Sequence, residues 1–394
     1  MSPESASVHG FDTAGLDYCP IMPTYGPPAV MFVKGEGSYL WDSNGKRYLD
    51  FLSGLAVTSL GHANPVVAAA IAEQASTLLH VSNLYTNPQA WKAARTIDRL
   101  HGGGGQIFFC NSGAEANECL IKLARKWGGR GKYVVLSAYG SFHGRTLATL
   151  HATGQPAKHE VFQPLPEGFR HAAWNDLKDF ERLITDEVAG ILLEPVQGEG
   201  GVNPADVEFF QGIRALCDER GLLMLVDEVQ TGFARTGEWF GYQHYGVQPD
   251  VVSMAKALGN GFPIGACWAK RDVAAAFQPG DHATTYGGTP LATAAANAVL
   301  AEMERIDAPA TATRQAARLT ASLEAIPGVT GVRGLGLLMA VELDRESKGV
   351  AGWLLDNGLV VNAVTATALR LAPPITVSDA EIVEAVELIR RSLQ

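Results

Sequence analysis

The segment Ser253–Ala266, SMAKALGNGFPIGA, places one lysine among small, apolar and glycine residues. Lysine is almost never buried without a partner, and unpaired burial lowers its pKa by up to roughly 3–5 units. A neutral amine near pH 7 is a nucleophile that attacks carbonyl groups to form a Schiff base. Lys256 is therefore the first candidate catalytic residue.

An acidic residue lies at the end of another apolar run, in VDEVQTG, Val226–Gly232. A carboxylate at Asp227 can pair with a cationic ring nitrogen and keep it protonated, as a pyridine cofactor needs in order to accept electrons. Gln230, three residues later, could bond a hydroxyl group on such a ring. An aspartate that only caps a turn explains Asp227 equally well.

The stretch NSGAEANE, Asn111–Glu118, is typical of a helix start. Ser112 can cap the helix, and Glu115 completes a capping box. Gly113 lets a ligand approach the backbone, and the free N–H groups of a helix N-terminus bind phosphate. A capped helix without a ligand is the alternative interpretation.

Three further loops carry polar groups. SFHGRT, residues 141–146, offers the Phe142 ring for stacking and the Arg145 guanidinium for a carboxylate. EPVQGEGG, residues 194–201, has two acids but no additional oxygen ligands or histidines nearby, so we expect no metal site. TTYGGTP, residues 284–290, offers hydroxyl groups for a second phosphate contact. Each loop could equally be an ordinary turn.

Together these groups supply an amine nucleophile, a pyridinium partner, a phosphate seat, a stacking ring and a carboxylate clamp. The combination fits pyridoxal 5′-phosphate (PLP). Nucleotide binding fits less well, because the glycines at residues 102–105 lack the Lys-Ser/Thr of a P-loop and precede a strand.

These residues need a scaffold that gathers them at one edge. Short apolar runs separated by helical patterns predict an α/β fold with a mainly parallel central sheet flanked by helices. Ligands bind at the carboxyl ends of such strands, where the candidate residues of the middle of the chain fall. The predicted strands are Gln106–Cys110, Lys132–Ser137, Gly190–Pro195, Leu222–Glu228 and Asp250–Ala255.

The two chain ends predict a smaller α/β domain. Near the start, residues 35–51 resemble a β-hairpin that turns at Asn44-Gly45. The tail predicts helices over 292–305 and 314–325, strands over 336–343 and 359–363, and a last helix opened by a capping box at Ser378–Glu381. We assign residues 1–58 and 292–394 to the small domain and 59–291 to the large domain.

The composition limits the partners. The 394 residues are 47% apolar and 18% charged, with a net charge of −10, which supports a large core and argues against nucleic acid and anionic membranes as partners. The start lacks the pattern of a secretory signal, and no apolar run approaches a membrane span. None of the five cysteines forms a C-x-x-C pair, so we expect reduced thiols and a cytoplasmic protein.

The chain resembles the fold-type I, class III PLP-dependent aminotransferases over almost its whole length. The stretches that carry the resemblance are PTYGPP, GLAVTSLGHANP, SNLY, NSGAEANE, SFHGRT, EPVQGEGG, LVDEVQTGFARTG, SMAKALGNGFPIGA, TTYGGTPLA and LVVN…LRLAPP. Within the class, the sequence is most similar to the enzymes that act on N2-acetyl-L-ornithine.

For the cofactor, the resemblance implies that Lys256 binds PLP covalently and later moves a proton. Asp227 would pair with the ring nitrogen, Gln230 would lie near the ring oxygen, and Phe142 would stack on the ring. Thr285 would reach the phosphate from the neighbouring subunit, so a homodimer with shared sites is expected. The remaining expected cofactor contacts are Ser112, Gly113, Ala114 and His143.

For the substrate, the resemblance implies that Arg370 binds an α-carboxylate. Glu199 would pair with Arg370 when that carboxylate is absent. Tyr25 and Arg145 would bind other polar groups of the amino-acid and 2-oxo-acid substrates. Leu55 stands where ornithine-specific relatives tend to carry tyrosine, which favours an acylated substrate.

The family pattern H-G-S-T-[FY]-G-G-N-P reads His282-Ala-Thr-Thr-Tyr-Gly-Gly-Thr-Pro290 here. Thr284 and Thr285 keep hydroxyl groups for phosphate binding. Thr289 in place of asparagine leaves the packing of this loop open, as does Ala283.

The implied reaction moves the terminal amino group between N2-acetyl-L-ornithine and 2-oxoglutarate or glutamate, in arginine biosynthesis. The alternatives are the same transfer with ornithine, succinylornithine, 4-aminobutyrate or a lysine-pathway intermediate. An aminomutase or decarboxylating enzyme with the same cofactor, and a protein that binds PLP without catalysis, are more distant alternatives.

Overall fold

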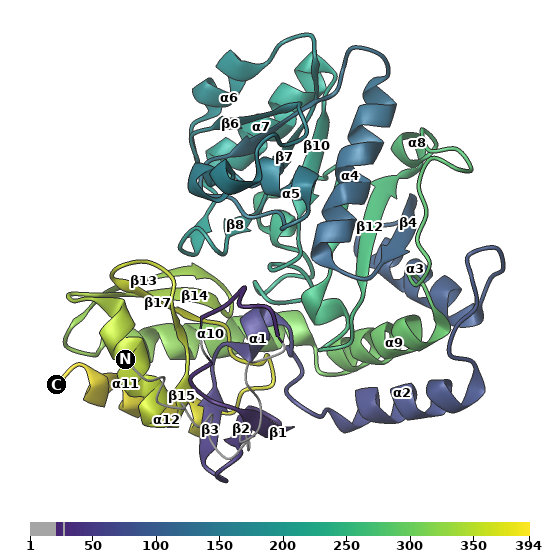
Figure 1. Cartoon of the computed structure of the whole chain (residues 1–394). Coiled ribbons are helices and arrows are strands. Elements are labelled where there is room, and N and C mark those ends of the chain that lie inside the picture. The colour runs from purple at the N-terminus through teal and green to yellow at the C-terminus, as the bar shows by residue number, and fades with distance from the viewer. Residues whose placement is uncertain (1–20, 27) are drawn as a thin grey trace, which may run out of the picture.

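The computed structural model describes residues 21–26 and 28–394, and Figure 1 shows its central sheet between helices. This sheet has seven strands in the order β4-β12-β11-β10-β7-β5-β6. Within it β12 runs antiparallel to both of its neighbours, and the other adjacent pairs are parallel, which confirms the predicted mainly parallel sheet. The strands are β4 (Gly105–Cys110), β5 (Val134–Ala138), β6 (Phe169–Ala172), β7 (Val188–Leu193), β10 (Leu223–Asp227), β11 (Val251–Met254) and β12 (Gly265–Lys270).

Both faces of this sheet are covered, because side chains alternate along each strand. In β10, Leu223 and Leu225 belong to the apolar cluster that contains α4 (Gly113–Gly128). The intervening β10 residues belong to the cluster on the other face, which contains α7 (Val207–Arg220). Burial on both faces explains why the central strands appear in the sequence as continuous apolar runs.

Two strands of the central sheet were not predicted. β12 begins with glycine and ends with lysine, and β6 reads FRHA, so neither is a continuous apolar run. β12 is nevertheless fully paired on both sides, with β4 and β11. Tertiary pairing here outweighs local composition.

Two smaller sheets bring the ends of the chain together. The first has the order β1-β2-β3-β15 and contains the predicted hairpin, in which Gly45 takes a φ of 81° in the turn. The second has the order β13-β14-β17-β16. Their strands are β1 (Phe32–Glu36), β2 (Tyr39–Asp42), β3 (Arg47–Asp50), β15 (Leu359–Val360), β13 (Val329–Leu335), β14 (Leu338–Leu343), β17 (Ala368–Leu371) and β16 (Asn362–Ala363).

The single strand predicted over residues 359–363 is wrong in one respect. Leu359 and Val360 pair with β3, whereas Asn362 and Ala363 pair with β17, so the run forms two strands in two sheets. Val361 is the link between them. The short pair β8 (Val196–Gln197) and β9 (Asn203–Pro204) forms a separate two-stranded sheet.

Polar caps and prolines set the helix starts. Asn64 and Asn87 accept hydrogen bonds from backbone N–H groups of α2 and α3, and both helices begin with proline. The predicted capping box of Ser378 and Glu381 opens α12. The other helices of more than six residues are α6 (Leu177–Leu183), α9 (Pro290–Arg305), α10 (Ala308–Glu324) and α11 (Ser347–Asp356), beside α2 (Pro65–Thr77), α3 (Pro88–Leu100) and α12 (Asp379–Ser392).

Helix α9 packs against α2 and α3 and runs alongside α2 in Figure 1. The helix predicted over 314–325 starts earlier, at Ala308, because a proline in its first turn is compatible with helix. The domain boundaries after residues 58 and 291 stay a prediction.

Two further expectations from the sequence concern the cysteines, expected to be reduced thiols, and the lack of a membrane-spanning segment. Cys110, Cys119, Cys217 and Cys267 are free and buried, whereas Cys19 lies outside the described residues. No helix in the described part of the chain combines the length and the apolar character needed to cross a lipid bilayer.

Candidate functional site

A pocket of about 400 Å³ opens at the carboxyl ends of the parallel strands. β4, β5, β7, β10 and β11 point the same way, so the loops that follow them meet at one edge of the sheet. Ten of the predicted site residues line this pocket: Ser112, Gly113, Ala114, Phe142, His143, Arg145, Glu199, Asp227, Gln230 and Lys256.

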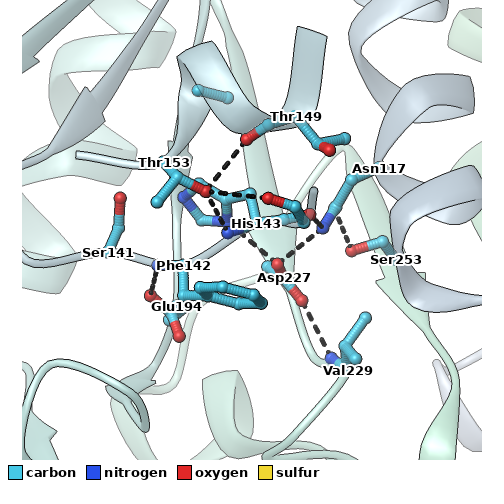
Figure 2. Close-up of polar contacts among 12 residues, drawn as sticks. Asn117, Ser141, Phe142, His143, Thr149, Thr153, Glu194, Asp227, Val229 and Ser253 are labelled. Atoms are coloured by element: carbon cyan, nitrogen blue, oxygen red, sulfur yellow. Dashed lines mark hydrogen bonds and ion pairs between the residues drawn. The ribbon is translucent and has the colours of Figure 1, made fainter. Parts of the chain in front are cut away.

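Asp227 is the last residue of β10, and three hydrogen bonds orient its carboxylate (Figure 2). Oδ2 accepts hydrogen bonds from Asn117 Nδ2 at 2.7 Å and from His143 Nδ1 at 2.9 Å, while Oδ1 accepts one from Val229 N at 3.0 Å. Ser253 in turn donates to Asn117 Oδ1 at 2.6 Å. The carboxylate therefore has one defined orientation, and its residue is 4% exposed.

His143 presents its second ring nitrogen without a partner. Because Nδ1 faces a carboxylate, it carries the proton of that hydrogen bond. Nε2 is buried and has no hydrogen-bond partner among the described residues. The His143 ring therefore orients the Asp227 carboxylate through this hydrogen bond. The sequence had predicted His143 only as a cofactor contact.

The loop after β5 carries Phe142 and is fixed through its backbone. Phe142 N donates to Glu194 Oε2 at 3.0 Å, and His143 N donates to Thr153 Oγ1 at 2.9 Å. Burial, reinforced by the charge of Asp227, raises the pKa of Glu194 well above its ordinary value. Lys158 Nζ lies 5.2 Å from the centre of the Phe142 ring. The ring is therefore held in place where it lines the pocket.

The N-terminus of α4 faces the same pocket. Ser112 Oγ accepts a hydrogen bond from Glu115 N at 3.2 Å, as predicted for the helix cap. The second half of the predicted capping box is absent from this turn, because the Glu115 carboxylate accepts instead from the backbone N–H of Asn111 at 2.6 Å. A Cβ on Gly113 would lie 2.7 Å from Val229 Cγ1, so glycine is required there.

Lys256 follows β11 and takes a φ of 46°, in the left-handed region that a side chain rarely adopts. No hydrogen bond or ion pair to its ammonium group occurs among the described residues. Burial lowers the pKa of Lys256 to about 8, although the acids of the pocket oppose the shift. The expected poorly partnered lysine is therefore present, in a backbone conformation that directs it into the pocket.

Arg370 belongs to another sheet and contacts two residues that line the pocket, Glu199 and Gln230. It lies on β17, and Nη1 donates to Glu199 Oε1 at 2.5 Å and to Gln230 Oε1 at 3.3 Å. Asn362 Oδ1 accepts from Arg370 Nε at 3.1 Å. Burial raises the pKa of Glu199, but the charge and hydrogen bond of Arg370 outweigh it and lower the pKa overall. Arg370 is 1% exposed, whereas the Glu199 side chain is 30% exposed.

Some predicted residues lie apart from this pocket. Thr285 lines a neighbouring hollow with Tyr286, and Tyr25 is 90% exposed. Leu55 lies in the short turn α1 (Ser53–Ala56) and is 37% exposed. Thr289, whose effect on the loop the sequence left open, donates its hydroxyl proton to Leu79 O at 2.7 Å.

Sequence reasoning missed Asn117, Ser253 and Thr153. Asn117 was visible within NSGAEANE, since it lies four residues after Gly113 and therefore on the same helix face. Thr153 and Ser253 act through contacts that no local pattern shows.

Comparisons with known proteins agree with this geometry. The family described as "Aminotransferase class-III" matches residues 21–393. The acetylornithine aminotransferase of Gloeobacter violaceus is 48% identical over 379 residues, covering 94% of each chain. The succinylornithine transaminase of Salmonella paratyphi B is 45% identical over 92% of this chain and 91% of its own.

Solved structures give the same family. The ornithine aminotransferase of Toxoplasma gondii superimposes with a TM-score of 0.90 at 32% identity, covering 95% of this chain and 92% of that chain. A second structure of that enzyme, with a TM-score of 0.89, has partial occupancy of PLP at its active site. The pocket lysine, the buried acid behind it and the match along nearly the whole chain lead to one conclusion: this protein belongs to the class III aminotransferases, with their fold-type I architecture.

Proposed function

We propose that this aminotransferase moves the terminal amino group between N2-acetyl-L-ornithine and 2-oxoglutarate or glutamate, using PLP, as a step of arginine biosynthesis. The carrying observation is the Glu199–Arg370 pair beside Lys256, because it offers one site to two differently charged substrates. Acetylornithine aminotransferases at 42–48% identity support the substrate.

The residues present fit PLP. The buried carboxylate of Asp227 suits a cationic ring nitrogen, and Phe142 suits the face of a ring. The backbone N–H groups at Gly113 and Ala114, at the start of a sixteen-residue helix, suit a phosphate. Lys256 has no hydrogen-bond or ion-pair partner among residues 21–26 and 28–394, so its amine is available for the aldehyde.

When bound, PLP accepts the electron pair that the substrate carbon leaves behind on losing its proton. The chain supplies the rest. Lys256 Nζ would hold the cofactor and, when free, would hold and move the proton that the substrate carbon loses. Asp227 would keep the ring nitrogen protonated, because its three hydrogen bonds hold the carboxylate in position.

The Glu199–Arg370 pair explains how two substrates share the site. With the pair closed, the guanidinium is masked, and a donor can present its terminal amine without meeting a free positive charge. With the pair open, Arg370 presents a fork for the α-carboxylate of 2-oxoglutarate or glutamate. Glu199, which is partly exposed and lies on a glycine-rich loop, would be the partner that moves. Arg145, at the exposed mouth, and Tyr25 would bind the remaining polar groups.

Succinylornithine is the second candidate donor, because a transaminase of that name is 45% identical to this chain. Leu55 lies outside the pocket of this chain, so the preference for acylated donors that its apolar side chain implies stays a prediction from the sequence. The panel below ranks these donors.

We also propose a homodimer in which Thr285 completes the partner's phosphate site. Thr285 is exposed, and large apolar side chains are exposed at the adjoining residue 286 and within residues 79–91, a segment that Asn83 Nδ2 joins to Thr284 O, which supports a covered surface. These side chains are Leu79, Leu84, Tyr85, Trp91 and Tyr286. Light scattering that gives the mass of a monomer would contradict the dimer. The cytoplasmic location stays a prediction.

The test is a panel of terminal-amine donors with 2-oxoglutarate, compared by kcat/KM. N2-acetyl-L-ornithine is expected to exceed ornithine and 4-aminobutyrate by at least about tenfold. Lys256→Ala is expected to lower kcat by at least about 10⁴-fold and to abolish covalent trapping of PLP by borohydride. A higher kcat/KM for ornithine would overturn the substrate, and covalent PLP in Lys256→Ala would overturn the lysine assignment.

A further inference from the structure

Three histidines meet beside the loop that carries Phe142. They are His151 on α5 (Leu147–Ala152), His159 between the 3₁₀ turns η1 (Pro156–Lys158) and η2 (Glu160–Phe162), and His171 on β6. One ring nitrogen of each lies within 4.8 Å of one ring nitrogen of each of the others. His159 is buried and the other two are partly exposed.

Hydrogen bonds fix which nitrogen of each ring carries a proton. His151 Nδ1 lies 2.7 Å from Pro166 O, and His159 Nε2 lies 2.6 Å from Thr153 O. A carbonyl oxygen can only accept, so both nitrogens are donors. His171 Nδ1 lies 2.9 Å from Ser137 Oγ, whose own proton goes to a backbone carbonyl at 2.6 Å, so Nδ1 is a donor here too.

The other nitrogens of the neutral rings therefore carry lone pairs. These are Nε2 of His151, Nδ1 of His159 and Nε2 of His171. His171 Nε2 is buried without a hydrogen-bond partner, and no hydrogen bond to the other two occurs among the described residues. One ring nitrogen of each histidine lies within 4.8 Å of the others, and the buried, unsatisfied Nε2 of His171 requires an explanation.

We propose that His151, His159 and His171 bind one Zn²⁺ ion per chain, with water as the fourth ligand. Imidazole nitrogen is a preferred zinc ligand, and ligating histidines generally donate their other N–H to a carbonyl or hydroxyl oxygen, as all three do here. In a tetrahedral site with Zn–N near 2.0–2.1 Å, ligand nitrogens are about 3.3 Å apart, so nitrogens that lie within 4.8 Å of one another move closer together when the ion binds. The sequence had led us to expect no metal, because these histidines lie far from the acidic loop considered there.

The ion would stabilise residues 147–162, which support the loop 141–146 that carries Phe142. Thr153, whose carbonyl accepts from His159, also accepts from the backbone N–H of His143. Ser141 Oγ likewise accepts from Gly154 N at 3.0 Å. A metal joining α5, the η1–η2 turn and β6 would therefore stabilise the loop without touching the substrate.

The experiment uses untagged holoenzyme, freed of metal with a chelator and titrated with Zn²⁺ against a chromogenic competitor. We expect saturation at one ion per chain and a rise in Tm on binding. His151→Gln and His171→Gln are each expected to weaken binding by at least about 100-fold. His80→Gln, which removes an exposed histidine outside the cluster, is the matched control and is expected to bind as the wild type does.

Cobalt gives a direct readout of the ligands. Co²⁺ in the wild type is expected to show the intense visible bands of tetrahedral coordination, and these bands should vanish in His151→Gln while the PLP absorption stays unchanged. His151 is partly exposed, so this variant carries the test if His171→Gln does not fold. Equal Zn²⁺ binding in wild type and His151→Gln, or a Co²⁺ spectrum of the hydrated ion, would overturn the proposal.

Discussion

Asp227 and Glu199 are two acids of one pocket, and the chain holds them in opposite ways. Asp227 accepts three hydrogen bonds from a helix, a loop and its own turn, and is buried. Glu199 has one ion pair, with Arg370, and a side chain that is 30% exposed. The cofactor end of the pocket is thus fixed, while the substrate end is adjustable.

The difference follows from where the partners originate. Those of Asp227 lie on α4, in the loop after β5 and in the turn after β10, all attached to the central sheet. Arg370 belongs to a different sheet, and Glu199 to a glycine-rich loop. A reaction with one cofactor and two alternating substrates needs this division, because orientation must be constant at one end and exchangeable at the other.

The largest effect is expected at the fixed end. Asp227→Asn should lower kcat by about 10³-fold, since the amide cannot stabilise a cationic ring nitrogen and must lose at least one of the present hydrogen bonds. Stopped-flow absorbance of the donor half-reaction measures this. Ser253→Ala, which removes a hydrogen bond to Asn117 without touching the carboxylate, is the matched control and should cost tenfold or less, about 1 kcal/mol. Similar losses in both variants would contradict a special role for the charge.

Removing the arginine at the substrate end of the pocket should have the next largest effect. Arg370→Ala is expected to raise the KM for 2-oxoglutarate by about 10²-fold, because a charge-assisted pair of hydrogen bonds to the carboxylate is lost. Arg370→Lys, which keeps the charge but not the fork, should recover part of the loss. The two half-reactions should be measured separately. An equal loss of rate in the acetylornithine half-reaction of Arg370→Ala would refute the assignment of Arg370 to the α-carboxylate of 2-oxoglutarate.

A smaller effect is expected for the acid that masks this arginine. Glu199→Gln should slow the donor half-reaction by about tenfold and leave the KM for 2-oxoglutarate unchanged or lower, because Arg370 stays unmasked. The control is Glu187→Gln, which weakens an Arg–Glu pair with Arg170 far from the pocket and should change neither half-reaction. A higher KM for 2-oxoglutarate in Glu199→Gln would remove the masking role.

The smallest effect concerns pH. Lys256 reacts as the free amine, and its pKa of about 8 means that the reactive fraction rises about tenfold per pH unit below 8 and levels off above it. The rate constant for PLP capture by the apoenzyme should follow this curve. Butylamine, whose pKa is unperturbed, is the control and should continue to gain reactivity above pH 8. A rate constant for the apoenzyme that does the same would show that burial does not lower the pKa.

The fold was predictable where burial is two-sided. The strands around Leu225 and Val252 are continuous apolar runs, and residues that follow such strands had to meet at one edge. β12 was missed because its small residues owe their conformation to neighbours on both sides. The division of residues 359–363 between two sheets has no periodic signature, because each two-residue piece is too short to show one.

The site was predictable as a set of residues but not as an arrangement. Lys256 and Asp227 stood out because charged groups interrupt or end apolar runs. Asn117 lies on a helix face that the sequence presents only as part of a capped helix, and Arg370 lies in an apolar strand whose neighbours cannot be read locally. The capping box predicted for Ser112 and Glu115 is another example. The spacing allows both of its hydrogen bonds, but the Glu115 carboxylate accepts from Asn111 N instead.

The pairing of β3 with β15 has a consequence for biogenesis. Backbone hydrogen bonds join Leu49 to Gly358 and Phe51 to Val360, so a strand made early in synthesis gains its outer neighbour from a segment made near the end. The first hairpin must wait, with one edge open, while most of the chain leaves the ribosome. A nascent chain stalled before residue 359 would expose that edge to pairing with other polypeptides.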